Sequence, residues 1–297
     1  MSENHHHAGG RHRWRLVVAF ALVAGYFVVE LVFALLSGSL ALLSDAGHMA
    51  VDVVALGAAV LATRIATRKD RTGRRTFGSY RAEVFASGLS VLLMLGVAGY
   101  VVLEAFDRAG QPVDVQTGPM IVVGGIGLVV NLVALALLRG GAAESLNVKG
   151  AYLEVVADTA GSVGVVAAGL LVATTGQTVW DTVVALAIGA FVAVRAVMLG
   201  RQVLAVLGQH APSDIDVDEV SADLSRIEGV AEIHDLHMWT LTSGMHVATA
   251  HLVTGEDTTL VQPVLDQARA VLRDRHGIAH ATLQVEPRAR GCAEIDW

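Results

Sequence analysis

Residues 40–63 read LALLSDAGHMAVDVVALGAAVLAT, an apolar run that contains two acids and one histidine. About 20 apolar residues cross the hydrocarbon core of a bilayer as a helix, so this run predicts a transmembrane helix. An ionisable group in the middle of the bilayer costs about 2.5–3.5 kcal/mol on insertion scales, and such groups face a bundle interior or a water-filled cavity. We therefore expect Asp45, His48 and Asp52 to point into a helix bundle.

Five further runs of similar length and composition occur in the 297 residues. Together with 40–63 they predict six spans, the others at 15–36, 84–106, 119–138, 151–174 and 180–203. This indicates a His-containing cytoplasmic segment at 1–13, a six-helix transmembrane domain at 14–208 and a soluble domain at 209–297. The fold class is an α-helical membrane protein with a C-terminal α+β domain.

In the soluble domain the spacing of apolar residues changes from a helical period to the alternation typical of strands, then to a helical period and to alternation again. Residues 216–227 and 259–276 have a helical period, while 231–242 and 245–253 read as strands joined by a hairpin across Ser243 and Gly244. Residues 280–287 alternate as a final strand. The order αββαβ favours two helices packed on one face of a three-stranded sheet.

The distribution of charged residues indicates the orientation of the chain in the membrane and argues against nucleic acid as a partner. Arginine and lysine crowd the start of the chain, the link at 64–81 and the link at 139–149, and the opposite links hold only Arg108. By the positive-inside rule, we expect a plasma-membrane protein with both termini on the cytoplasmic side. The net charge is −7, and residues 210–297 hold 15 acids against 6 Lys and Arg. An acidic soluble domain argues against nucleic acid and is compatible with cations.

Two spans carry matching pairs of polar residues. His48 and Asp52 in the second span and Glu154 and Asp158 in the fifth are each spaced i, i+4, so each pair shares one helical face. If the two faces meet, one imidazole and three carboxylates form a four-ligand site for a divalent metal ion. Metal ligands must be deprotonated, so metal and protons compete for such a site. The alternative interpretation is that these residues pair with one another or cap helix bends.

Other intramembrane polar residues are expected to have supporting roles. Asp45 is interpreted as a helix-start or access-path residue and not as a metal ligand. Glu30, Asn131 and Asp181 are interpreted as packing or capping residues.

The order of several motifs resembles the cation diffusion facilitator family of divalent-metal transporters. The resembling stretches are SGSLALLSDAGHMAVD (37–52), RRTFGSYRAEVFAS (74–87), LNVKGAYLEVVADTAGSVGV (146–165), GVAEIHDLHMWTLTSG (229–244) and HGIAHATLQVE (276–286). The resemblance implies a homodimer in the lipid bilayer, with a cytoplasmic ferredoxin-like domain. It implies efflux of cytosolic Zn²⁺ or a similar ion in exchange for external protons by alternating access. It implies neither catalytic residues nor a cofactor.

One residue departs from the family pattern. The family's transport site pairs two (His or Asp)-x-x-x-Asp motifs, and Glu154 stands where zinc-selective members have His. A third carboxylate favours ions that prefer oxygen ligands, so Co²⁺, Cd²⁺, Fe²⁺ and Mn²⁺ join Zn²⁺ as candidates. The link between the second and third spans offers Asp70 but no histidine. We expect the second metal site that some relatives have there to be absent.

The soluble domain holds seven histidines, and six of them lie at or after residue 234. The resemblance relates His234, His251, Gln284 and Glu286 to a cytosolic metal site at the dimer interface of some relatives. His234, His251 and Glu286 are suitable ligands, and a hydrogen-bonded set of strand residues is the alternative.

Three other functions fit the sequence less well than transport does. The spans contain no H-E-x-x-H helix, so an intramembrane zinc protease is not indicated. A metal sensor would need only the site of the soluble domain. A carrier of organic cations would use aromatic residues, which are only 5% of this chain.

Overall fold

The computed structural model describes residues 13–66, 73–108, 114–142, 146–242, 244–255 and 261–287. Six long helices come first in the chain, and all six are long and apolar enough to cross a membrane. They are α1 (Arg13–Ser37), α2 (Leu40–Ala66), α3 (Ala82–Arg108), α4 (Thr117–Ala142), α5 (Leu146–Thr175) and α6 (Val179–Leu207). The six predicted spans are confirmed, each helix being a few residues longer than predicted. The histidines at 5–7 and Asp70 lie outside the described residues.

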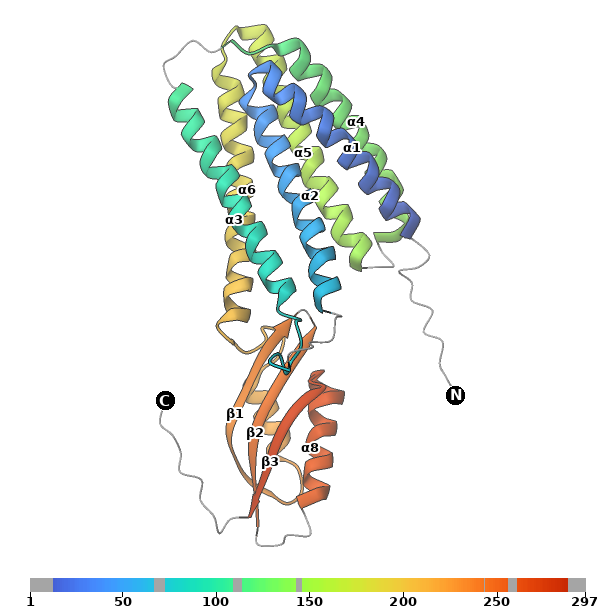
Figure 1. Cartoon of the computed structure of the whole chain (residues 1–297), viewed down its shortest axis with the longest axis vertical. Helices are drawn as coiled ribbons and strands as arrows, with labels where there is room; N and C mark the ends of the chain where they lie inside the picture. The colour runs from blue at the N-terminus through green and yellow to red at the C-terminus, as the bar shows by residue number, and fades with distance from the viewer. Residues whose placement is uncertain are drawn as a thin grey trace. The chain divides into compact units, whose positions relative to one another are not determined.

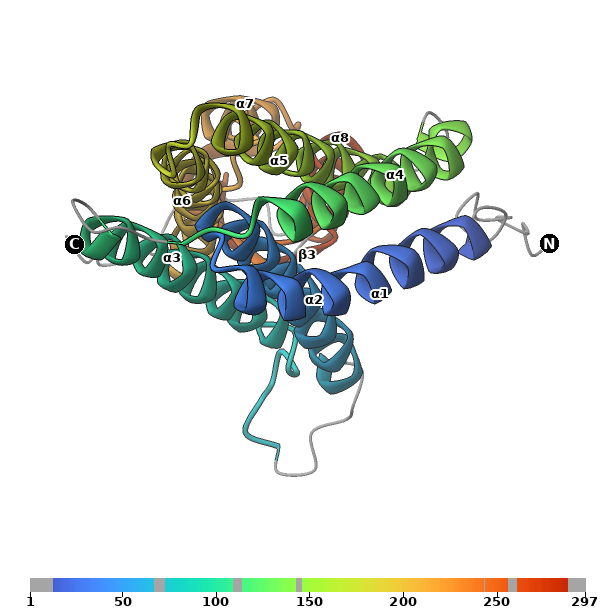
Figure 2. The ribbon, with the colours of Figure 1, turned by 90° about the horizontal axis from the view of Figure 1, so that it is seen from above.

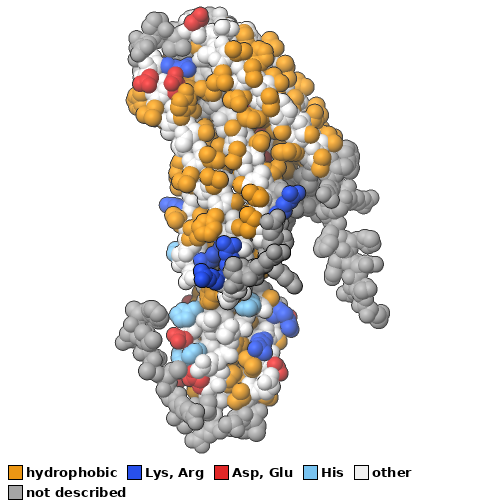
Figure 3. Space-filling model, viewed as in Figure 1, with side chains coloured by type: hydrophobic (Ala, Val, Ile, Leu, Met, Phe, Trp, Pro, Cys, Tyr) orange, Lys and Arg blue, Asp and Glu red, His pale blue; other side chains and the backbone are white. Residues whose placement is uncertain are grey.

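The outer faces of the helices are apolar. Leu35, Leu92 and Phe106 are examples of large hydrophobic side chains that are mostly exposed. Figure 3 shows hydrophobic side chains spread over the helices on the face that is viewed. In water such a surface would be costly, and in lipid it is the expected one.

The interior of the bundle is built from small and medium side chains. Helix α4 packs along α5 and also against α1 (Figures 1 and 2). Close approach of α1 to α4 depends on Gly127, because a Cβ atom there would overlap the ring of Tyr26. The Tyr26 hydroxyl donates to the carbonyl of Val123, 3.1 Å away, so a buried polar group is satisfied.

The start of α2 is capped by an acid of another helix. Asp181, in the first turn of α6, is buried and accepts hydrogen bonds from the backbone N–H groups of Leu40 and Ala41, at 2.6 and 3.1 Å. The hydroxyl of Ser39 donates to the same carboxylate at 2.6 Å. The first N–H groups of a helix have no partner within it, and a carboxylate also suits the positive end of the helix dipole. The capping role predicted for Asp181 is confirmed, with α2 as the capped helix.

An arginine also contacts the residues of this cap. Arg108, at the end of α3, donates to the carbonyl of Gly38 at 2.7 Å, and its Nη1 lies 3.8 Å from Asp181 Oδ2. Gly38 takes a positive φ of 69°, which allows the tight turn between α1 and α2. Three helix ends are therefore joined by one network of charges.

The C-terminal domain is a three-stranded sheet with two helices. Its elements are α7 (Val217–Ser225), β1 (Val230–Thr242), β2 (Met245–Thr254), α8 (Val261–His276) and β3 (His280–Pro287). The strand order is β1-β2-β3, with β1 antiparallel and β3 parallel to β2. Both helices share one apolar core with the sheet, through residues such as Leu224, Leu252 and Leu272. The predicted αββαβ order is confirmed.

Asp223 ties the two helices of this domain together. Its carboxylate on α7 lies 2.8 Å from Arg275 Nη1 and 2.9 Å from His276 Nε2, both at the end of α8. Arg226, which follows α7, adds a third contact at 2.7 Å. Burial raises the pKa of Asp223, but the His276 hydrogen bond and the neighbouring arginines lower it more. Its net pKa therefore lies below the ordinary value of 3.8.

We predict that removal of the Asp181 cap destabilises the helix bundle. Asp181→Ala leaves the N–H groups of Leu40 and Ala41 without an acceptor, which should cost about 2 kcal/mol or more. The measurement is the thermal midpoint of the detergent-solubilised protein. Asp107→Ala is the matched control, because Asp107 is an exposed acid near the end of α3. Equal midpoints for the two variants would contradict the capping role.

We also predict acid sensitivity in the C-terminal domain. Because folding lowers the pKa of Asp223, its stabilising effect is complete above about pH 4 and is lost as the pH falls through the folded-state pKa. The urea midpoint of this domain in the full chain, followed by peptide-resolved hydrogen exchange, should fall in that range. Asp223→Asn should remove most of the change. A variant with the same pH profile as the wild type would count against the role of Asp223.

Candidate metal sites

A buried polar cluster lies where α2 meets α5. His48 Nε2 lies 3.6 Å from Asp52 Oδ2 and 3.7 Å from Asp158 Oδ1. One ligand atom from each of the three residues falls within 4.8 Å of the others. His48 and Asp158 are buried and Asp52 is partly exposed. One imidazole and two carboxylates with these separations can hold a divalent ion between them.

Helix geometry explains why these residues meet. His48 and Asp52 are one turn apart on α2, so both side chains leave the same face of the helix. Asp158 comes from α5, and Glu154 precedes it by one turn. The structure thus brings together three of the four predicted ligands.

Glu154 makes a different contact. Its Oε1 accepts a hydrogen bond from Arg195 Nη2 of α6, at 2.6 Å, and its carboxylate is not part of the three-residue cluster. Arg195 is not among the residues predicted from the sequence. An arginine within the apolar run 180–203 is nevertheless as unexpected as the acids of the second span, so the sequence does mark this residue.

Further polar groups lie in the same bundle. Asp45 is buried within α2, and its carboxylate lies against Gly161 of α5, where a Cβ atom would overlap it. It lies more than one turn inside the helix, so it is not a helix-start residue. Glu30 of α1 is fully buried inside the bundle. Of the packing and capping roles expected for Glu30, this burial agrees with packing.

A second cluster lies on the sheet of the C-terminal domain. His234 on β1 is directly opposite His251 on β2, and their ring centroids are 5.0 Å apart. Glu286 on β3 contacts both, with Oε1 3.0 Å from His251 Nδ1 and Oε2 3.7 Å from His234 Nε2. Gln284 donates to Glu286 at 2.7 Å and so orients its carboxylate. The three residues predicted from the sequence lie together.

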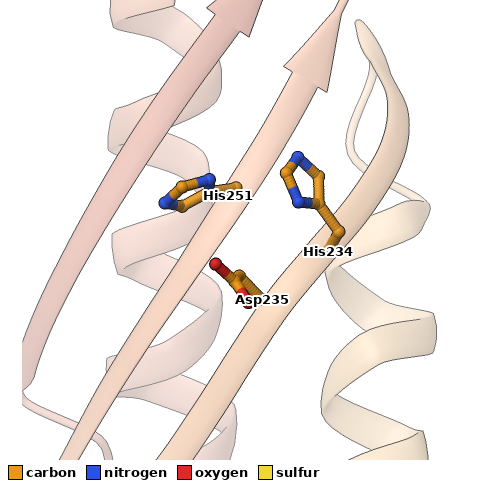
Figure 4. Close-up of side chains that lie close together, drawn as sticks. All are labelled: His234, Asp235 and His251. Carbon is orange, nitrogen blue, oxygen red and sulfur yellow. The ribbon is translucent and has the colours of Figure 1, made fainter. Parts of the chain in front are cut away.

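An irregularity in β1 brings a further acid, Asp235, close to the two histidines. The β1–β2 register shifts between His234 and His237, and Asp235 takes a positive φ of 54°. Neighbouring residues of a regular strand point to opposite faces, but a bulge can re-aim a side chain. Ligand atoms of His234, Asp235 and His251 therefore lie within 4.8 Å of one another (Figure 4). The sequence pattern showed no sign of the bulge.

The fold and these clusters define a multi-pass membrane protein with a buried group of one histidine and two acids inside its bundle. The cation efflux transmembrane domain family matches residues 16–207, and the family of cation efflux protein cytoplasmic domains matches residues 212–288. The chain belongs to the cation efflux family, whose members are divalent-metal efflux transporters.

Curated relatives resemble the chain over most of its length. The metal cation efflux system protein CzcD of Cupriavidus metallidurans is 40% identical over 95% of this chain and 89% of its own. A cadmium, cobalt and zinc/H(+)-K(+) antiporter of Bacillus velezensis is 34% identical over 97% and 93%, respectively. The zinc transporter ZitB of Escherichia coli is 35% identical over 92% and 87%.

A solved structure also resembles the C-terminal part. It is the metal-bound C-terminal domain of the Cupriavidus CzcD transporter, with 38% identity. The match covers 24% of this chain and 99% of that one, with a TM-score of 0.23.

Proposed function

We propose that this protein exports a divalent metal ion from the cytosol, with Zn²⁺ as the first candidate, in exchange for external protons. The observation that carries this proposal is the cluster of His48, Asp52 and Asp158 inside an otherwise apolar bundle. Apart from the metal ion itself, no cofactor or catalytic residue is part of the mechanism. Two of the relatives named above are described as a cadmium, cobalt and zinc antiporter and as a zinc transporter, so these three ions come before Fe²⁺ and Mn²⁺.

The mechanism follows from the chemistry of the three ligands. A metal ion that reaches the cluster from the cytosol binds the imidazole and the two carboxylates in their deprotonated forms. When the helices rock and the cluster faces outward, protons displace the ion because they compete for the same atoms. The protonated cluster then faces inward again and releases its protons to the cytosol. Metal thus moves out and protons move in.

Topology and assembly are part of the same proposal. The arginines and lysines near the first helix and in the links at 64–81 and 139–149 support a topology in which both termini lie on the cytoplasmic side of the plasma membrane. The match to the family's cytoplasmic domain supports a homodimer held partly by the C-terminal sheet. A metal ion bound by His234, His251 and Glu286, with Asp235, then regulates the dimer from the cytosolic side.

We predict that the membrane cluster is essential for transport. In proteoliposomes with an inward-directed zinc gradient and an opposite proton gradient, Asp158→Asn and His48→Ala should reduce zinc flux to the protein-free background. His48→Ala removes the imidazole ligand, and Asp158→Asn replaces a charged carboxylate oxygen by a neutral amide oxygen, so both lower the affinity for the ion. Asp107→Asn on the exposed end of α3 is the matched control. Wild-type flux in both cluster variants would overturn the proposal.

We also predict separate metal binding by the C-terminal cluster. The double variant His234→Ala/His251→Ala should lose one zinc equivalent per chain in equilibrium titration of the full protein, because both imidazoles are removed. Zinc flux should remain measurable, since the cluster of the bundle is unchanged. His246→Ala on the same strand as His251 serves as the control. Unchanged stoichiometry in the double variant would show that these residues are only hydrogen-bonded strand polars.

A further inference from the structure

Arg195 of α6 lies between two of the four predicted transport ligands. Its Nη2 donates to Glu154 Oε1 at 2.6 Å, and its Nη1 lies 3.2 Å from His48 Nε2. The guanidinium also lies over the ring of Phe191, with 5.9 Å from Cζ to the ring centroid. The arginine is therefore held from three sides by groups from α2, α5 and α6.

The contact with His48 has a chemical consequence. A guanidinium has five N–H donors and no acceptor, so in this contact Nε2 of His48 must accept. The lone pair of Nε2 is also the electron pair that the imidazole would give to a metal ion, because Asp52 and Asp158 face this same nitrogen. One lone pair cannot serve both partners, so the arginine contact and metal coordination exclude each other.

The pairing of charges around the cluster agrees with this geometry. Glu154 and Arg195 form a pair of opposite charges, and their side chains are 46% and 24% exposed. The remaining acids of the cluster, Asp52 and Asp158, carry two negative charges that match one divalent cation. If Glu154 were also a ligand, Arg195 would be left without this carboxylate inside the bundle, which is costly.

We infer that Arg195 competes with the transported metal ion for His48 Nε2, and that Glu154 is the counter-ion of Arg195 and not a metal ligand. This inference rests on the proposed transport function and assigns to it a residue that sets the affinity for the metal ion. When metal binds, Arg195 gives up His48 and keeps Glu154. When metal leaves, Arg195 takes His48 back. The competition weakens metal binding at the cluster, and a transporter needs binding weak enough for release.

The test measures KM and maximal rate of zinc flux for three variants in proteoliposomes. Arg195→Gln frees His48 Nε2 and leaves the negative charge of Glu154 beside the cluster. Its KM should fall by about tenfold, with a lower maximal rate because release becomes slower. Glu154→Gln leaves the positive charge of Arg195 unbalanced, so its KM should rise by about tenfold. Arg201→Gln is the matched control, because Arg201 is an exposed arginine of the same helix.

The double variant Arg195→Gln/Glu154→Gln separates the two roles of Glu154. If Glu154 is only the counter-ion, removal of both charges should bring KM back to within about threefold of the wild type. If Glu154 is a ligand, the double variant should have a KM at least as high as that of Glu154→Gln, and this result would overturn the inference. An unchanged KM in Arg195→Gln, with only a lower rate, would also overturn it, because that is the signature of a merely structural residue.

Two outcomes need a second measurement: a variant that does not fold, and a wild type that passes no metal. If Arg195→Gln does not fold because Glu154 is left unpaired, Glu154→Gln and the double variant still decide between the two roles. If the wild type passes no metal, the proposed function fails by itself. The competition is then read from zinc affinities of the same variants in equilibrium titration, in a His234→Ala/His251→Ala background that lacks the C-terminal cluster.

Discussion

The packing of α2 against α5 depends on the cost of ionisable groups in lipid. His48, Asp52 and Asp158 cannot face hydrocarbon, so each must find polar partners inside the bundle. Their convergence is compatible with close helix contact because small residues line the same surfaces. Gly161 on α5 is one example, since a larger residue would displace the carboxylate of Asp45. The positions of the polar side chains and of the glycines thus follow from one constraint, which is that ionisable groups must lie inside the bundle and not in lipid.

The two candidate metal clusters are built in different ways from regular elements. In the bundle, helical spacing alone places His48 above Asp52, and the cluster is completed by a neighbouring helix. In the C-terminal sheet, register places His234 opposite His251, but Asp235 joins them only because β1 is irregular and Asp235 has a positive φ. The first arrangement follows from periodicity, and the second needs a local departure from it.

This difference explains what could be predicted from the sequence. The six spans, the αββαβ order and the meeting of His48, Asp52 and Asp158 all follow from apolar periodicity and i, i+4 spacing. The role of Asp181 as the cap of α2 could be predicted only as capping in general, because its target lies 140 residues away in the chain. The partnership of Glu154 with Arg195 could not be predicted from the α5 motif, since it depends on which face of α6 turns toward α5. The bulge at Asp235 leaves no mark in the strand pattern.

Helix α6 contacts α2 at several levels, and two of these contacts differ in kind. At the start of α2, Asp181 accepts hydrogen bonds from backbone N–H groups that no metal ion can replace. Two turns further along, Arg195 contacts an imidazole nitrogen that a metal ion can take. A change of ligand at His48 therefore alters one contact between these helices and leaves the other in place. Because one end of α2 stays held while its middle exchanges partners, the free energy of metal binding can act on the position of α2 relative to α6 without undoing the fold.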